Sequence, residues 1–210
     1  MRSNTPPRRG LSAEAPRYVC CCVTVTQIGV FAYAILSRLA YVVFVGWVLR
    51  REDRDGFYTR RFGPALGFRR FRRRAALLMY HDAFAFILLC VTTRHSWILP
   101  VGPSTSVAAG AALVIAGLGT KLWAARTLGS GAYYWLNFFA PEAAGNPVTT
   151  GPYRFVSNPM YTIGYLQTYG LALITRSLPG LIAAVFSQAA ILTFYVIVEK
   201  PHFTRLHRSS

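Results

Sequence analysis

The residues of this chain best suited to chemistry lie at the ends of two C-terminal apolar segments. Asn158 and Pro159 form a helix start signal, because asparagine caps free backbone N–H groups and proline fits the first helical turn. Such a helix start attracts a carboxylate or a phosphate. Glu199 lies where the apolar run 189–198 stops, and Pro201 is expected to end that helix. In an antiparallel pair, these ends place an anion acceptor beside a cation acceptor, which suits a zwitterion.

Two carboxylates, Glu199 and Asp82, are candidates for accepting a proton during catalysis. Asp82 falls inside an apolar segment, where ionisable groups usually face a cavity or a partner. A carboxylate at the C-terminal end of a helix is unfavourable by about 0.3 to 1 kcal/mol unless a cation compensates. The alternative for each carboxylate is therefore a structural ion pair, for Glu199 with Lys200, Arg154 or a C-terminal arginine, and for Asp82 with Arg38 or His81.

Two glycine-containing stretches are expected near the same membrane face. Gly117 and Gly119 allow a backbone or a flat ligand to approach closely, although glycines in an apolar helix are more commonly packing positions. The stretch 149–154 provides a tight turn followed by an aromatic ring and a guanidinium group, close to Asn158 in the sequence. Its candidate functional residues are Gly151, Pro152, Tyr153 and Arg154.

The composition indicates which elements position these residues. Of the 210 residues, 53% are apolar and only 14% are charged, whereas a soluble domain carries about a quarter charged residues. The 23 basic and 7 acidic residues give a net charge of +16 and fall in blocks between apolar runs. This pattern is typical of a multi-pass membrane protein and excludes a disordered chain or a disulfide-stapled secreted domain. The four cysteines match neither zinc nor redox spacing, so no metal site is predicted.

The apolar runs predict an all-α fold with about five transmembrane helices. The first run is long enough for one tilted helix with an interfacial extension, and the other four are each close to the ~17 to 25 residues that a bilayer requires. Residues 1–17 are expected to form a basic N-terminal tail, and residues 18–210 a single membrane domain. Only residues 176–178 separate the last two spans, which must therefore form a tight helical hairpin. The predicted spans are residues 18–49, 75–93, 107–123, 159–175 and 179–198.

The arginine-rich segment from Arg50 to Arg74 predicts the orientation. Basic loops stay in the cytoplasm, so the mouth of the hairpin is expected on that side as well. The aromatic residues interleaved with these arginines favour anionic lipid headgroups over nucleic acid as the partner. The basic N-terminus would then lie outside, a conflict that a paired or re-entrant first segment would remove; cleavage after residues 32–34 is the alternative. The excess of arginine over lysine suggests a bacterial plasma membrane.

Two C-terminal stretches carry a family resemblance. Residues 151–164 read Gly-Pro-Tyr-Arg-Phe-Val-Ser-Asn-Pro-Met-Tyr-Thr-Ile-Gly, and residues 198–203, one hairpin later, read Val-Glu-Lys-Pro-His-Phe. This order resembles the integral-membrane methyltransferase superfamily, which contains phospholipid N-methyltransferases and isoprenylcysteine carboxyl methyltransferases. Ser157-Asn158-Pro159 stands where the family commonly has Arg-His-Pro, and Lys200 where it commonly has a second acid. The Asn-Pro-Met-Tyr form is similar to the phosphatidylethanolamine branch.

The resemblance implies that S-adenosylmethionine binds between the third span and the mouth of the hairpin. By the same resemblance, Gly117 and Gly119 are similar to a glycine element near the cofactor, and Glu199 belongs to the polar shell around it. The aromatic faces of Trp135 and Tyr165 tolerate a cationic sulfonium or amine and are assigned to the substrate. The remaining residues expected around the cofactor are Gly151, Pro152, Tyr153, Arg154, Asn158, Pro159 and Tyr161.

The implied function is methyl transfer to the amine of a phosphatidylethanolamine-type lipid, with Glu199 or Asp82 accepting the amine proton. Three alternatives stay open. A carboxyl methyltransferase of the isoprenylcysteine type would act on a lipidated or hydrophobic carboxylate and would need no such base. A membrane reductase with a similar C-terminal pattern would use a nicotinamide cofactor. A small transporter or scaffold would use Glu199 and the arginine-rich segment only as anchors.

Overall fold

The protein is an all-α membrane protein, as predicted. The computed structural model describes residues 25–97, 100–141 and 148–206, and within these ranges it contains helices and no strands. Among the described residues, four helical segments are long and apolar enough to cross a membrane. They are α1 (Val25–Asp55), α3 (Pro64–Thr92), α4 (Pro103–Tyr133) and α6 (Leu178–Phe194), which continues through a π-helical turn, η5 (Tyr195–Glu199), into α7 (Lys200–Leu206). The predicted N-terminal tail, residues 1–17, lies outside the described residues.

The prediction of a full-length fourth span over 159–175 is wrong. The α-helix in this region, α5 (Leu166–Thr175), has ten residues and follows a short 3-10 turn, η4 (Ile163–Tyr165). Ten residues rise only about 15 Å, half of a bilayer core. Asn158 does cap this turn, because its side chain accepts from the backbone N–H of Tyr161 at 3.3 Å. The turn does not continue as a helix, because Thr162 has a non-helical backbone, with φ −99° and ψ −91°, and regular α-helix starts only at Leu166.

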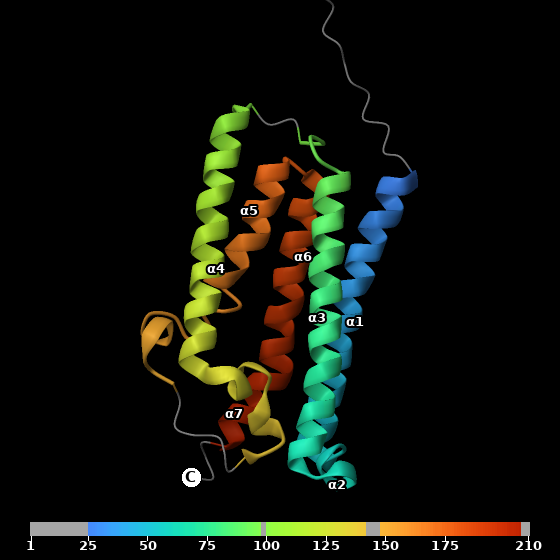
Figure 1. Cartoon of the computed structure of the whole chain (residues 1–210), viewed down its shortest axis with the longest axis vertical. Coiled ribbons are helices and arrows are strands. Elements are labelled where there is room, and N and C mark those ends of the chain that lie inside the picture. Colours follow the sequence, from blue (N-terminus) through green and yellow to red (C-terminus); the bar gives the residue numbers. More distant parts are fainter. Residues whose placement is uncertain (1–24, 98–99, 142–147, 207–210) are drawn as a thin grey trace, which may run out of the picture.

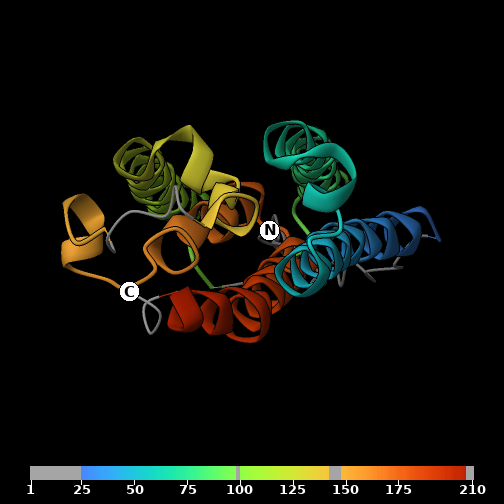
Figure 2. The same ribbon diagram turned by 90° about the horizontal axis from the view of Figure 1, so that it is seen from below.

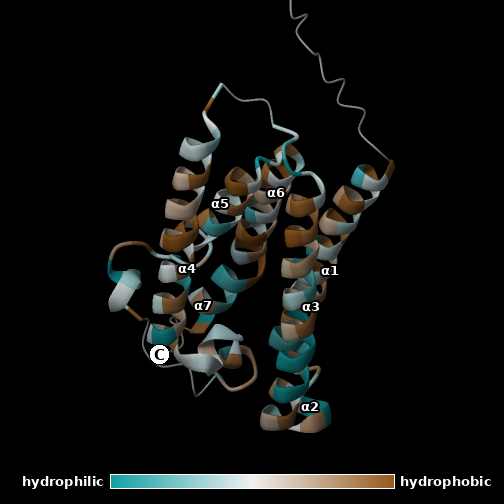
Figure 3. Ribbon diagram, turned by 45° about the horizontal axis from the view of Figure 1, so that its top comes forward, coloured by the Kyte–Doolittle hydropathy of each residue, from teal (hydrophilic) through white to brown (hydrophobic). Residues whose placement is uncertain are grey.

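The arginine-rich segment is also helical to a greater extent than its predicted role as a loop implies. α1 continues to Asp55, and α3 already begins at Pro64 instead of residue 75. Between them lies the single turn α2 (Thr59–Phe62). The buried carboxylate of Glu52 accepts from the backbone N–H groups of Tyr58 and Thr59, at 2.6 and 3.1 Å, and so fixes the turn. The exposed arginines therefore project from the end of a rigid helical pair, the hydrophilic end of α3 in Figure 3.

The helices form two pairs bridged by α6. α1 packs along α3, α4 packs along α5, and α6 contacts α1, α3 and α5 (Figure 1). Seen from below, α6 runs between the two pairs (Figure 2). The expected hairpin is confirmed, because α5 ends at Thr175 and α6 begins at Leu178. Ser177 caps α6 by accepting from the backbone N–H of Gly180 at 2.8 Å.

Pro201 does not end the last helix. The π-helical turn at Tyr195–Glu199 shifts the hydrogen-bond register, and Pro201 falls in the first turn of α7, where a missing N–H costs little. α2, α7 and the short 3-10 turn η1 (Leu136–Phe138), which follows α4, lie at one end of the bundle, the lower end in Figure 1. Glu199 therefore lies near the arginine-rich end, although within a continuing helix instead of at a helix terminus.

Glycines allow α4 and α5 to approach each other closely. A Cβ atom at Gly117 would come within 2.4 Å of the backbone nitrogen of Gln167, and one at Gly110 within 2.6 Å of the carbonyl oxygen of Gly170. Gly119 is exposed, with open space where its Cβ would be. Gly117 is thus a helix-packing position, whereas the cofactor contact expected of the exposed Gly119 stays a prediction.

We expect Gly117→Ala to lower the thermal unfolding midpoint in detergent, because the new methyl group meets backbone that cannot move without separating the two helices. Overpacking of this kind costs about 1 to 3 kcal/mol. Gly119→Ala is the matched control, since both variants gain the same helix propensity, about 1 kcal/mol, but only Gly117→Ala creates a clash. A midpoint for Gly117→Ala equal to that of Gly119→Ala would contradict the packing role.

Candidate active site

The centre of the candidate site is the carboxylate of Glu199, which is buried in the π-helical turn. Its Oε1 atom accepts a hydrogen bond from the indole N–H of Trp135 and one from the hydroxyl of Tyr161 at 2.6 Å. Among the described residues, no donor reaches Oε2. A buried carboxylate must be hydrogen-bonded or paired, so half of this group is left for a ligand that is cationic or donates hydrogen bonds.

Trp135 reaches Glu199 because α4 bends back towards the bundle. The bend is at Gly129, whose φ of 78° is favourable only for glycine, and α4 ends four residues later. Trp135 itself has a φ of 60°, a left-handed conformation that costs a tryptophan about 1 to 3 kcal/mol. Its ring packs edge-on against Phe71 and Phe194, at centroid distances of 6.2 and 5.6 Å. The packing and the hydrogen bond to Glu199 hold this strained geometry.

Tyr161 reaches Glu199 from the irregular chain before α5. The side chain of Asn158 accepts from its backbone N–H, and the amide of Gln188 on α6 donates to its carbonyl oxygen at 3.2 Å. Gln188 is itself fixed by the hydroxyl of Tyr169, which donates to it at 2.6 Å. Asn158 and Glu199 are therefore connected through Tyr161 at one end of the bundle, although Asn158 starts a turn and not the expected helix.

The ion-pair alternative for Glu199 is not what the structure shows. Lys200 and Arg154 are exposed, and Arg205 pairs with Asp53 on α1. Within the described part of the chain, no cation lies within ion-pair distance of Glu199. The carboxylate is held by aromatic donors instead.

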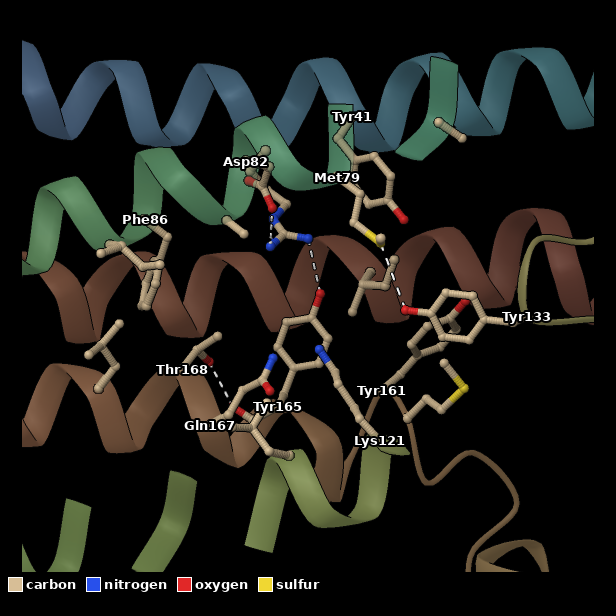
Figure 4. A pocket seen from close by; sticks show the side chains of 18 of the residues that line it. Tyr41, Met79, Asp82, Phe86, Lys121, Tyr133, Tyr161, Tyr165, Gln167 and Thr168 are labelled. Carbon is tan, nitrogen blue, oxygen red and sulfur yellow. Dashed lines mark hydrogen bonds and ion pairs between the residues drawn. The ribbon is translucent and has the colours of Figure 1, made fainter. Parts of the chain in front are cut away.

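A cavity of about 360 Å³ lies between α1, α3, α4, α5 and α6, next to the Glu199 cluster (Figure 4). Trp135 and Tyr161 belong to both, since each lines the cavity and bonds to Glu199. Ile87 on α3 and Leu118 on α4 also line the cavity while about half exposed, at 49% and 46%. The cavity therefore reaches the lipid-facing surface between these two helices.

The ion pair of Asp82 lies in this cavity. Asp82 bonds to the guanidinium of Arg38 at 2.6 Å, and Arg38 also donates to the hydroxyl of Tyr165 at 3.0 Å. This is one of the two ion pairs proposed for Asp82. His81 instead bonds to the hydroxyls of Tyr33 and Ser37, at 2.7 and 2.8 Å. Asp82 is thus both ion-paired and exposed to the cavity, so the pairing does not remove it from the site.

The stretch 151–154 packs on the other side of α4. It forms a 3-10 turn, η3 (Gly151–Arg154), and a Cβ at Gly151 would come within 2.6 Å of the Thr127 hydroxyl oxygen. Pro152 is buried, and Arg154 is exposed. Burial, and secondarily the Glu199 carboxylate, raises the pKa of Tyr153 to about 12, so its hydroxyl stays protonated at neutral pH. Of these four residues, Tyr153 is the one in electrostatic contact with Glu199.

The structure adds residues that sequence reasoning missed. Lys121, Gln167, Tyr41 and Tyr133 all line the cavity. The signal for Lys121 was a lysine within an apolar segment, where a charge usually faces a cavity. Tyr41, Tyr133 and Gln167 gave no signal, because similar polar and aromatic residues occur throughout the chain. Trp135 and Tyr165, both predicted to face a ligand, do line the cavity.

Comparison with known proteins identifies relatives of this chain. Residues 105–210 match the family model of phospholipid methyltransferases. A phosphatidylethanolamine N-methyltransferase of Phaeosphaeria nodorum is 28% identical over 204 residues, covering 90% of this chain and 22% of the relative. Proteins of the same name are 32% identical over 143 residues in Aspergillus niger (65% of this chain, 13% of the relative) and 36% identical over 103 residues in Schizosaccharomyces japonicus (49% and 11%).

The chain thus spans about a fifth or less of the length of these relatives. No solved structure matches it significantly. The matched family model covers half of the chain, including Glu199, Trp135, Tyr161 and α4 to α7. The chain belongs to the phospholipid methyltransferase family.

Proposed function

We propose that this protein transfers a methyl group from S-adenosylmethionine to the amine of a phosphatidylethanolamine-type lipid. The observation that carries the proposal is the buried Glu199 carboxylate, half satisfied by Trp135 and Tyr161, beside a cavity that reaches the lipid-facing surface. Family membership supports the reaction, and the names of the fungal relatives support the lipid.

The residues around Glu199 fit the methionine part of the cofactor. The open Oε2 atom is suited to an ammonium group, which needs a buried acceptor with no competing cation. Tyr153 is in electrostatic contact with Glu199, and Asn158 is connected to it through Tyr161; their neutral polar groups suit the rest of the cofactor. When bound, the cofactor supplies a methyl group that already carries its leaving group. The protein therefore has to align the reacting groups and exclude water.

Aromatic rings and the carboxylate of Asp82 stabilise the positive charges of the two reactants, the sulfonium of the cofactor and the amine of the lipid. The rings of Tyr41, Tyr133 and Tyr165 line the cavity and stabilise a cation without forming a bond to it. Because an alkyl amine is protonated at neutral pH, it must lose a proton before it attacks a methyl group. Asp82 lines the cavity and Glu199 does not, so we assign proton acceptance to Asp82 and cofactor binding to Glu199.

The site is proposed to face the cytoplasm, on the side of the exposed arginines of α2 and α3, which would contact anionic lipid headgroups. The relatives named above are fungal and give no support to a bacterial membrane. The conflict with the basic N-terminus concerns residues outside the described part of the chain.

Membranes containing the protein, given S-adenosylmethionine labelled in the methyl group, should form labelled mono-, di- or trimethylated ethanolamine phospholipids. Thin-layer separation of the lipid extract identifies them, and membranes without the protein are the control. Label that mild alkali releases as volatile methanol would instead indicate a methyl ester, and thus carboxyl methylation. Absence of label from the lipid fraction would overturn the proposed substrate.

Glu199→Gln should weaken binding of S-adenosylmethionine at least about tenfold, because loss of a charge-assisted hydrogen bond costs about 1.5 to 3 kcal/mol. Calorimetric titration of the purified protein measures this affinity. Asp55→Asn removes an equal charge from an exposed carboxylate at the same end of the bundle and should leave the affinity unchanged. Equal affinities for Glu199→Gln and Asp55→Asn would mean that Glu199 does not hold the cofactor.

A further inference from the structure

The cavity contains more positive charge than its own residues neutralise. Three charged residues line it: Arg38, Lys121 and Asp82. Asp82 forms its ion pair with Arg38, so one acid stands against two cations. Among the described residues, Lys121 makes no ion pair: Asp82 acts on it only from beyond ion-pair distance, and its Nζ lies 4.9 Å from the centre of the Tyr165 ring. An excess cation among membrane helices is costly, so the partly buried Lys121 leaves the cavity electrostatically prepared for an anion.

The surrounding chain is built to admit the Lys121 side chain. A Cβ atom at Gly164 would lie 2.7 Å from Cγ and 3.3 Å from Cε of Lys121. Any side chain at Gly164 would therefore displace the lysine from its path into the cavity. Two polar atoms of other cavity-lining residues are buried without a partner in the described structure: Nε of Arg38, which is a donor, and Oε1 of Gln167, which is an acceptor. Arg38 thus retains one cationic N–H in addition to those used by Asp82 and Tyr165.

Charge and polarity change in order along the cavity (Figure 4). Tyr133 and Tyr161 lie at one end, where Tyr161 bonds to Glu199; Lys121 lies in the middle with the Arg38–Asp82 pair, and Phe86 lies at the far end. Along the cavity, starting from the Tyr161 end, the lining is thus first aromatic, then cationic and finally apolar. An amine phospholipid has the complementary order of ammonium, phosphodiester and acyl chain. Its chains would point away from the arginine-rich end, as they do for a lipid of that leaflet.

We infer that Lys121, together with Nε of Arg38, binds the phosphodiester of the lipid substrate. The inference rests on the proposed methyl transfer for the identity of the lipid. The ammonium then lies among the aromatic rings beside Glu199 and Asp82, and the chains leave past Phe86, Ile87 and Leu118. Lys121 is in this role a specificity residue, which selects amines that carry a phosphate two carbons away.

The test is a calorimetric titration of the purified protein with a short-chain phosphatidylmethanol, which has the phosphodiester and acyl chains but no amine. The matching diacylglycerol lacks the phosphate. Lys121→Met should weaken phosphatidylmethanol binding about tenfold or more, as expected for a charge-assisted contact, and leave diacylglycerol binding unchanged. Lys121→Arg should retain most of the affinity. Arg126→Met, which removes an exposed cation from the same helix, is the control and should bind as the unmodified protein does.

Gly164→Ala provides a second variant, because it keeps the lysine but displaces its side chain. It should also weaken phosphatidylmethanol binding, in a protein whose thermal unfolding shows that it is folded. Equal phosphatidylmethanol affinities for Lys121→Met and Arg126→Met would overturn the inference. Weakened S-adenosylmethionine binding with unchanged phosphatidylmethanol binding would overturn it as well, by assigning the cations to the cofactor carboxylate.

The titration needs no methyl transfer, so the two proposals fail separately. Lysine-dependent phosphatidylmethanol binding without labelled lipid products would support the phosphodiester site and overturn the proposed activity. If the protein forms methylated lipids but Lys121→Met binds phosphatidylmethanol as the unmodified protein does, the activity is supported and the phosphodiester site is overturned.

Discussion

The need to satisfy one buried carboxylate determines much of this structure. Glu199 lies inside a helical bundle, where an unpaired charge is strongly unfavourable, and its described partners are two aromatic donors instead of a cation. To supply them, α4 bends at Gly129, and Trp135 adopts a left-handed backbone conformation. The chain before α5 forms turns, and these place Tyr161 at the same oxygen. Three irregular segments thus meet at one side chain.

This convergence also explains the cavity. A full-length helix over 159–175 would run beside α4 along its whole length, whereas the observed α5 begins at Leu166. The space beside the irregular segment receives Lys121, which passes over Gly164, and the ring of Tyr165. Meanwhile Gly110, Gly117 and Gly170 hold the rest of α5 tightly against α4. α4 and α5 are therefore closely packed along α5 and leave an open region beside the irregular segment that precedes it.

The distribution of charge relates the site to the proposed chemistry. Lys200, next to Glu199 in the chain, is exposed and forms no ion pair with it. The negative charge beside the cavity is therefore concentrated on Glu199 and Asp82, and the free positive charge on Lys121. The ring of Tyr161, which bonds to Glu199, and the ring of Tyr165 line the cavity together with Lys121 (Figure 4). In the proposed complex, the cofactor ammonium would neutralise Glu199 and the lipid phosphodiester would neutralise Lys121, without bringing water into the bundle.

The sequence by itself determined the all-α membrane class, the C-terminal hairpin and the family, because apolar run length, charge and local motifs are written along the chain. It also singled out Trp135 and Tyr165, which line the cavity. It predicted a regular helix from Asn158 and a helix end at Pro201, and both are wrong: turns with a non-helical Thr162 follow the Asn158 cap, and a π-helical turn precedes a helix that continues through Pro201. Only the tertiary structure assigned Gly117 to packing and brought Lys121 to Arg38 and Asp82. Such contacts join four helices, and their distances depend on how the helices cross, which no local pattern records.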